Sequence, residues 1–244
     1  MTPLRMICGL QPVREAIRAH GANLARVLVE RSDSPQLEAV ARFAVDHGAK
    51  VERVPRGDLD RISKGAKHQG AAAFAPELTL RPLEELEMGA GALLLALDEL
   101  EDPQNFGAIL RSAVAFGATG VIWPEHRSAP LSPATFRASA GAVEHAVLCR
   151  VGSLTTAIAD LRARDVTVIG LEMQADTALD TLSLLGPVCL VVGAEGKGLR
   201  KSVKQGCDFL ARLPMKGKLS SLNASVAAAI ALYEAVRQRG ASGS

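Results

Sequence analysis

The chain has 244 residues, of which 48% are apolar and 3% aromatic, and its formal net charge is +2. A chain of this length accommodates one large domain or two small ones with ordinary hydrophobic cores. The shortage of aromatic side chains argues against a stacking platform for single-stranded nucleic acid. The small net charge does not by itself indicate a polyanionic partner.

The four cysteines form no C-x-x-C pair, so the sequence indicates neither a zinc site nor a disulfide framework. The N-terminus lacks the long apolar stretch of a signal peptide, and no long uncharged apolar run predicts a membrane span. We therefore expect a cytoplasmic protein with no metal and no membrane partner.

Residues 1–78 alternate between helical and extended patterns. The sequence "PVREAIRAHG" predicts a short helix that Gly21 ends, and Ser34 with Pro35 predicts the start of a helix that runs to Gly48. Strands are predicted at "LARVLVE", "AKVERV" and "GAAAFAPE", and a short helix at "RGDLDRISK". Together these segments predict a small α/β domain.

Residues 79–91 mix proline, glycine and acidic residues without a clear period. Such composition is typical of an interdomain linker, here with a short helix expected at 82–87.

From residue 92 onward the chain predicts a second α/β domain, which extends to residue 244. The runs "ALLLALDEL" and "GPVCLVVGAE" are continuously apolar, as in strands buried on both faces of a parallel sheet. Further strands are predicted at "GVIWPE", "VTVIGLEM" and "FLARLPM". They alternate with helices predicted at "NFGAILRSAVAFG", "SPATFRASAGAVEHA", "SLTTAIADLRARD" and "SLNASVAAAIALYEAVRQRG". This alternation predicts a largely parallel sheet.

Three polar or glycine-rich stretches follow predicted strands, where parallel sheets bind ligands. In "DELEDPQNFGAILRSA", Asn105 lies where a helix begins and Arg111 follows it; a helix cap and a solvated charge are the alternative interpretation. In "VVGAEGKGLR", glycines surround Glu195 and allow a ligand to approach the backbone, although a flexible loop would look the same. Their spacing fits neither a dinucleotide fingerprint nor a phosphate-binding loop.

The third stretch, "PMKGKLSSLNASVAAAI", places Ser220, Ser221 and Asn223 ahead of an alanine-rich helix. These residues predict either a cap, with Ser220 or Ser221 as the capping residue, or the wall of a binding site. Basic residues gather nearby: the segment 197–218 contains seven of them and a single acid, Asp208, for a local charge of +6. Such a cluster favours a phosphate-bearing partner, with solvated helix faces as the alternative.

Taken together, "DPQNFGAILRSA", "VVGAEGKGLR" and "LPMKGKLSSLNASVAAAI" resemble the three ordered motifs of the SpoU (TrmH) family of RNA ribose 2′-O-methyltransferases. The resemblance covers about residues 92–240; Ala224 stands where the family usually has valine. Residues 1–78 are similar to the L30e-like substrate-binding domain of some members, through "GLQPVREAI" and "KHQGAAAF". The two-domain layout and "LYEAVRQR" most resemble the members that methylate a guanosine ribose of 23S rRNA.

The resemblance implies a C-terminal SPOUT domain with a parallel sheet and a deep trefoil knot, although knots are rare among protein folds. It also implies a homodimer that binds S-adenosyl-L-methionine and RNA. The catalytic residues that match the family are Asn105, Arg111, Glu195, Ser221 and Asn223. The matching cofactor contacts are Gly193, Glu195, Gly196, Leu213, Met215, Ser221 and Leu222. The expected RNA contacts are Lys64, Lys67, His68, Arg111, Lys197, Arg200, Lys216 and Lys218.

Two alternatives to this function stay open at this point. Within the enzyme class, the alternatives are methylation of a tRNA ribose and methylation of an rRNA site that confers antibiotic resistance. Outside it, the chain would be a non-catalytic RNA-binding protein. The complete set of matching catalytic residues argues against the second alternative.

Overall fold

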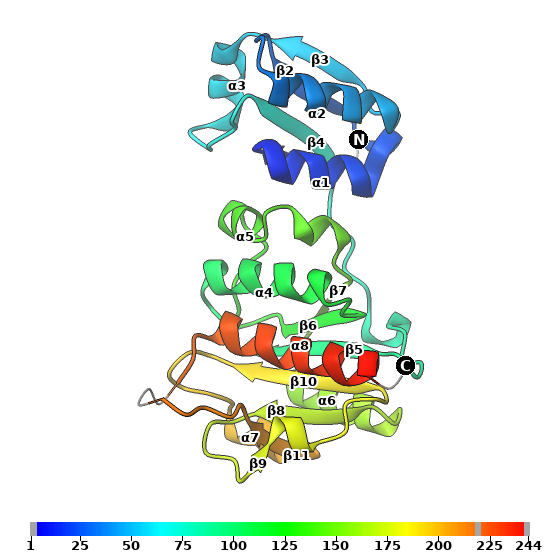
Figure 1. The fold of residues 1–244 in the computed structure, drawn as a ribbon, viewed down its shortest axis with the longest axis vertical. Coiled ribbons are helices and arrows are strands. Elements are labelled where there is room, and N and C mark those ends of the chain that lie inside the picture. The colour runs from blue at the N-terminus through cyan, green and yellow to red at the C-terminus, as the bar shows by residue number, and fades with distance from the viewer. Residues whose placement is uncertain (1–3, 218–220, 242–244) are drawn as a thin grey trace. The chain divides into compact units, whose positions relative to one another are not determined.

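The computed structural model describes residues 4–217 and 221–241 (Figure 1). By its internal contacts the chain divides into two compact units. The first contains residues 1–79 together with Ala140–His145, and the second contains residues 80–139 and 146–244. In the described part of the chain, no helix combines the length and apolar character needed to cross a membrane.

The first unit is an α/β fold on a four-stranded mixed sheet of order β1-β4-β2-β3 within the described residues. Its elements are β1 (Leu4–Cys8), α1 (Leu10–His20), β2 (Arg26–Glu30), α2 (Pro35–Asp46), β3 (Val51–Val54), α3 (Arg56–Ser63) and β4 (Ala71–Pro76), with a 3₁₀ turn, η1 (Gly21–Asn23). Strand β2 pairs parallel with β3 and antiparallel with β4, and β1 pairs antiparallel with β4. The predicted helices and strands are all present, whereas β1 was not predicted.

The second unit is built on a seven-stranded sheet within the described residues, of order β7-β6-β5-β10-β8-β11-β9, in which every pairing is parallel. Its strands are β5 (Leu93–Asp98), β6 (Gly120–Pro124), β7 (Leu148–Val151), β8 (Thr167–Leu171), β9 (Thr177–Ala178), β10 (Val188–Gly193) and β11 (Phe209–Arg212). Its helices are α4 (Pro103–Ala115), α5 (Pro133–Ala138), α6 (Leu154–Ala163), α7 (Lys201–Gly206) and α8 (Ala224–Ala241), with 3₁₀ turns η2 (Leu83–Glu85) and η4 (Leu179–Thr181). This architecture confirms the predicted α/β class with a parallel sheet; the knot implied by the resemblance stays a prediction.

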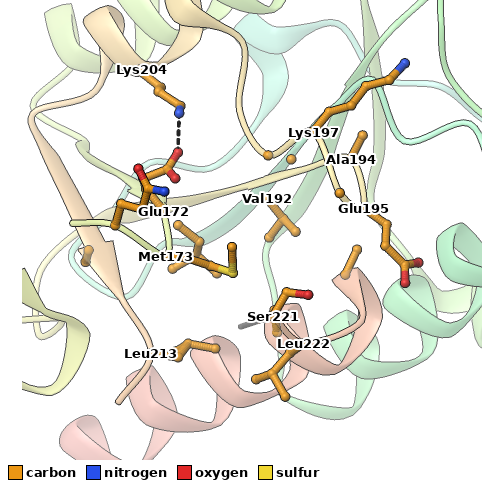
Figure 2. Close-up of a pocket in the computed structure, with 18 of the residues that line it drawn as sticks. Glu172, Met173, Val192, Ala194, Glu195, Lys197, Lys204, Leu213, Ser221 and Leu222 are labelled. Carbon is orange, nitrogen blue, oxygen red and sulfur yellow. Dashed lines mark ion pairs between the residues drawn. The ribbon is translucent and has the colours of Figure 1, made fainter. Parts of the chain in front are cut away.

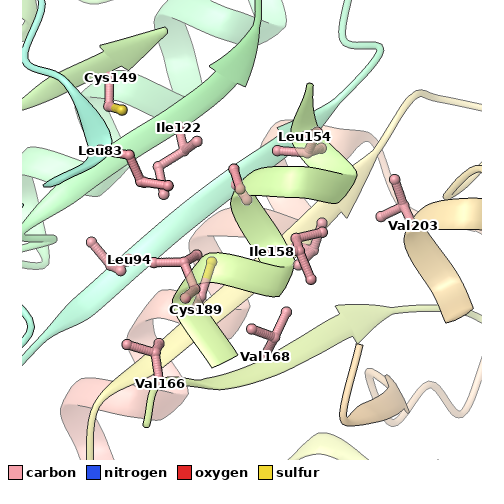
Figure 3. Close-up of a cluster of buried hydrophobic side chains, with 14 of the residues drawn as sticks. Leu83, Leu94, Ile122, Cys149, Leu154, Ile158, Val166, Val168, Cys189 and Val203 are labelled. Carbon is pink, nitrogen blue, oxygen red and sulfur yellow. The ribbon is translucent and has the colours of Figure 1, made fainter. Parts of the chain in front are cut away.

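Helices cover both faces of this sheet, which explains why its central strands are apolar throughout. On one face α6 and α7 pack on β5, β6, β8 and β10, and Figure 3 shows Leu154 and Ile158 of α6 among the strand side chains. On the other face α8 lies along β10 and contacts α4, which in turn contacts α5. The rings of Phe106 on α4 and Trp123 on β6 are 5.3 Å apart and join that layer to the sheet.

Residues 80–91 differ from the expected linker, because they pack on the second unit. Leu83 and Leu86 are buried in its core, and Arg164, which directly follows α6, donates hydrogen bonds to both of their carbonyl oxygens. The short helix expected in this segment is present as η2. The apolar side chains in an otherwise polar segment account for the difference, since burial of a leucine contributes about 2 kcal/mol.

The helix predicted over 132–146 is also shorter than expected. It ends at Ala138, because Ala140 and Gly141 have positive φ angles of 51° and 88°, which no α-helix accommodates. The chain then forms the 3₁₀ turn η3 (Ala142–His145) in the first unit. There Glu144 is buried and accepts two hydrogen bonds from Arg5, at 2.7 and 3.0 Å.

Candidate functional site

The first predicted motif forms the start of α4, directly after β5. Asp102 is the N-cap, and its carboxylate accepts hydrogen bonds from the backbone N–H groups of Gln104 and Asn105. The alternative that Asn105 caps this helix is therefore wrong, and its side chain is free for other contacts. Arg111 is exposed and makes no hydrogen bond or ion pair with the residues that the structure describes.

The second motif is a tight loop after β10. A Cβ atom on Gly193 would lie 2.2 Å from the backbone carbon of Gly198, so only glycine fits this position. The N–H of Gly198 donates to the carbonyl of Ala194 at 2.8 Å, and Gly196 and Gly198 have positive φ angles of 75° and 65°. The loop is thus shaped by its own backbone contacts and is not a flexible connection.

An ion pair fixes the end of this loop to β5. Asp98, whose side chain is 0% exposed, accepts hydrogen bonds from the backbone N–H of Arg200 at 2.8 Å and from its Nε at 2.7 Å. Gly193 and Asp98 are also partners in the register of β10 and β5. Arg200 was expected to contact RNA, but the buried carboxylate already holds its guanidinium, so we assign it to the architecture of the loop.

The third motif leads into α8, which Asn223 caps. Its Oδ1 accepts hydrogen bonds from the backbone N–H of Ser225 at 2.9 Å and from that of Val226 at 3.4 Å. Ser221 is not the expected cap, because α8 begins only at Ala224. Ser220, the other expected capping residue, and Lys218 lie outside the described residues.

The three motifs meet in a cluster of two amides and one carboxylate. Nδ2 of Asn105 lies 3.3 Å from Oε2 of Glu195, and Nδ2 of Asn223 lies 3.3 Å from the same oxygen. Asn223 also donates to Oδ1 of Asn105 at 2.9 Å. Three residues predicted as catalytic are thereby brought into direct contact, whereas no hydrogen bond or ion pair joins Arg111 to them among the described residues.

A pocket of about 520 Å³ opens at the carboxyl ends of β8 and β10, beside this cluster. The residues that line it and were predicted as cofactor contacts are Gly193, Glu195, Gly196, Leu213, Met215, Ser221 and Leu222. Glu195 belongs to both the pocket and the amide cluster, so it joins the two. Figure 2 shows Glu195 on one side of the pocket and Glu172 with Lys204 on the other.

Several pocket residues were not found from the sequence. They come from the end of β8 and from α7, and they include Leu171, Glu172, Met173, Gln174 and Lys204. These residues match none of the three motifs. The only available signal was that "VTVIGLEM" predicts a strand, whose carboxyl end lies at the ligand-binding edge of a parallel sheet.

The pocket fits an adenosyl cofactor in size and chemistry. Its volume lies within the range of about 300–1,000 Å³ typical of small-molecule sites, and its walls combine aliphatic side chains with a few polar groups. A Cβ atom on Gly196 would meet no atom within 4 Å, so the glycine loop leaves its backbone accessible. In residues 4–217 and 221–241, no cluster of three potential metal-ligating side chains occurs.

The remaining residues expected to contact RNA have different environments. Lys197 is exposed and lines the pocket, and Lys216 is exposed next to the lining residue Met215. Lys64 and Lys67 are exposed on the first unit. His68 is only 5% exposed.

Both ring nitrogens of His68 are engaged. Nε2 pairs with Asp60 at 2.8 Å, and Nδ1 accepts from the N–H of Gly70 at 3.0 Å. An imidazole held in this way has no group left for RNA, so we assign His68 a structural role instead of the expected RNA contact.

Residues 92–233 match the SpoU rRNA Methylase family, and residues 6–80 match a family described as RNA 2′-O ribose methyltransferase substrate binding. The chain is 41% identical over 239 residues to the 23S rRNA (guanosine-2′-O-)-methyltransferase RlmB of Xylella fastidiosa, with 96% of each chain covered. It is 43% identical over 239 residues to an uncharacterised tRNA/rRNA methyltransferase of Mycobacterium avium, covering 96% of this chain and 77% of that protein. The crystal structure of the SpoU methyltransferase AviRb from Streptomyces viridochromogenes, in complex with the cofactor AdoMet, matches with a TM-score of 0.79 and 27% identity, covering 97% and 90% of the two chains.

Proposed function

Because this chain belongs to the SpoU rRNA methylase family, we propose that it methylates a ribose 2′-hydroxyl in RNA, with S-adenosyl-L-methionine as the methyl donor. The substrate we propose is a guanosine of 23S rRNA, since the relative from Xylella fastidiosa that is similar over almost the whole chain is named for that reaction. A protein that acts on rRNA is expected in the cytoplasm.

The observation that carries this proposal is the position of Glu195. Its side chain lines the pocket, and its carboxylate accepts hydrogen bonds from Asn105 and Asn223. A cofactor in the pocket and a ribose on the amide cluster would therefore lie against the same residue. Holding two reactants in a fixed orientation is a large part of what an enzyme must do for group transfer between them.

The bound cofactor supplies a methyl group on a sulfonium, which the ribose 2′-oxygen accepts as its hydroxyl loses a proton. Asn105 and Asn223 are suited to orient the ribose, because amides both donate and accept hydrogen bonds. Arg111 is exposed and stays charged at physiological pH, so we assign it to an RNA phosphate and to the developing negative charge on the 2′-oxygen. Ser221 lines the pocket, which supports a role beside the cofactor.

Alanine substitutions separate these roles. Arg111→Ala and Asn105→Ala are each expected to lose methyl transfer to RNA while keeping the affinity for S-adenosylmethionine, as measured by calorimetry and by transfer of a labelled methyl group. Arg150→Ala, which removes a half-exposed arginine at the end of β7, is the matched control and should retain activity. Full activity of either variant, Arg111→Ala or Asn105→Ala, would refute the role assigned to that residue.

The substrate is tested separately. RNA from a strain that lacks the gene should lack one 2′-O-methylation in 23S rRNA, and the purified protein should restore it. A missing mark in tRNA would support the tRNA alternative instead. Failure of the wild-type protein to bind S-adenosylmethionine would favour a non-catalytic RNA-binding protein.

We further propose a homodimer in which α8 lies at the interface. Its apolar residues Val226, Ile230, Tyr233 and Val236 are all exposed in the single chain, and they lie at helical spacing. An apolar stripe of this kind on a soluble domain typically marks a protein–protein contact. Analytical ultracentrifugation should detect a dimer that Ile230→Asp dissociates.

A further inference from the structure

Glu172 is a pocket residue that belongs to none of the three motifs. It directly follows β8, and its backbone N–H donates to the carbonyl of Ala211 on the neighbouring strand at 2.9 Å. Its carbonyl oxygen accepts from the N–H of Ala175 at 3.2 Å. Hydrogen bonds therefore hold both the N–H and the carbonyl group of Glu172, and this fixes the backbone from which its side chain extends at the edge of the pocket.

The carboxylate of Glu172 is held between α7 and the glycine loop. It forms an ion pair with Lys204, and its Oε2 would lie 3.7 Å from a Cβ atom on Gly198. The side chain of Glu172 is 16% exposed and that of Lys204 is 34% exposed. Both residues line the pocket, across from Glu195 in the view of Figure 2.

This carboxylate has unused capacity to accept hydrogen bonds. Oε2 is buried against the ammonium group of Lys204, whereas Oε1 accepts no hydrogen bond from the described residues. An ionised carboxylate offers about four acceptor positions, and a single ammonium group does not fill them. A ligand in the pocket that donates a hydrogen bond can occupy one of the remaining positions. A partly exposed ion pair on its own contributes little to stability, so stability alone does not account for the pair.

We propose that Glu172 is a cofactor-binding residue that accepts a hydrogen bond from a donor group of the adenosyl cofactor, and that Lys204 positions it. This inference rests on the proposed function. The cofactor has three kinds of donor, namely the α-ammonium group of the amino-acid portion, the ribose hydroxyls and the adenine amino group. A carboxylate accepts hydrogen bonds from each of them, and a ligand without the ammonium separates the first from the two donors of the nucleoside.

The experiment measures the affinity of two ligands by calorimetry, for the wild-type chain and for Glu172→Gln. S-adenosylhomocysteine carries all three donors, whereas 5′-methylthioadenosine carries those of the nucleoside and lacks the ammonium. A weakening of about tenfold or more for both ligands supports a contact with the nucleoside, and the same loss for S-adenosylhomocysteine alone supports a contact with the ammonium. Unchanged affinity for both ligands overturns the proposal.

Two further variants make the test specific. Glu125→Gln is the matched control, because Glu125 follows β6 of the same sheet and also forms an ion pair, with Arg150, but lies outside the pocket. It should leave both affinities unchanged. Lys204→Met should weaken the two ligands in the same proportion as Glu172→Gln; a different proportion overturns the positioning role of Lys204. If the wild-type chain binds neither ligand, the result contradicts the proposed function itself. If the wild-type chain binds them and Glu172→Gln binds them equally well, only this inference is contradicted.

Discussion

Asn223 has two separable tasks, and two substitutions distinguish them. Its Oδ1 caps α8, whereas its Nδ2 donates to Asn105 and Glu195. Serine caps a helix about as well as asparagine but has no amide to donate. Asn223→Ser therefore removes the contacts within the amide cluster and keeps the cap, while Asn223→Ala removes both.

The expected magnitudes follow from these contacts. Loss of an N-cap costs about 1 kcal/mol, and loss of the amide contacts in this partly exposed cluster costs about 1 kcal/mol more. Asn223→Ala should thus lower the free energy of unfolding by about 2 kcal/mol and Asn223→Ser by about 1 kcal/mol. Methyl transfer should fall about a hundredfold in both variants, because a displaced positioning group has effects of that order.

The assays are urea unfolding followed by circular dichroism and transfer of a labelled methyl group to RNA from a strain that lacks the gene. Two results would refute the reasoning. Equal stability of the serine and alanine variants would show that Asn223 does not stabilise α8 as a cap. Full activity of Asn223→Ser would show that the amide contacts do not orient the site.

Three further predictions concern the frame of the site. Gly193→Ala should abolish cofactor binding in calorimetry, because its Cβ would lie 2.2 Å from the backbone of Gly198; wild-type affinity would contradict this packing. Asp98→Asn should lower the free energy of unfolding, measured in urea, by about 2 kcal/mol, since it leaves Arg200 without its buried carboxylate. An unchanged unfolding midpoint would show that the ion pair between Asp98 and Arg200 does not stabilise the fold. Burial raises the pKa of Cys207 to about 11, so at about pH 8 only about 0.1% of it is thiolate. Iodoacetamide should label Cys207 in urea and hardly at all in the folded protein, with labelling rising as the pH approaches 11; equal rates in both states would refute this.

Much of the fold was evident in local patterns. The continuous apolar runs at β5 and β10 identified strands buried on both faces, and the alternation with helices identified the parallel sheet. Strands β7 and β9 were not predicted. The two residues of β9 are too few to show a period, and the four residues of β7 closely follow a segment that was predicted to be helical. The buried leucines of the expected linker were missed because its prolines and glycines dominated its pattern.

The site shows the same division. The glycine loop was evident from the sequence, and the resemblance of the three motifs to a known family identified Asn105, Glu195 and Asn223, which are in contact. Which of two polar residues caps a helix depends on where the first turn begins, and sequence reasoning placed that turn wrongly at both α4 and α8. His68 and Arg200 looked like free surface groups because the contacts that engage them form only in the folded chain, with Asp60 in the first case and with Asp98 of a neighbouring strand in the second.

The sequence by itself determined the alternation of strands and helices, the glycine loop and the three motifs, because these depend on residues close together in the chain. Only the tertiary structure decided which strands are neighbours. It set β8 beside β10, which brings Glu172 to the pocket, and it joined Asn105 to Asn223 across 118 positions of sequence. Strand order follows from how the whole chain packs its apolar faces, and no local window contains that information.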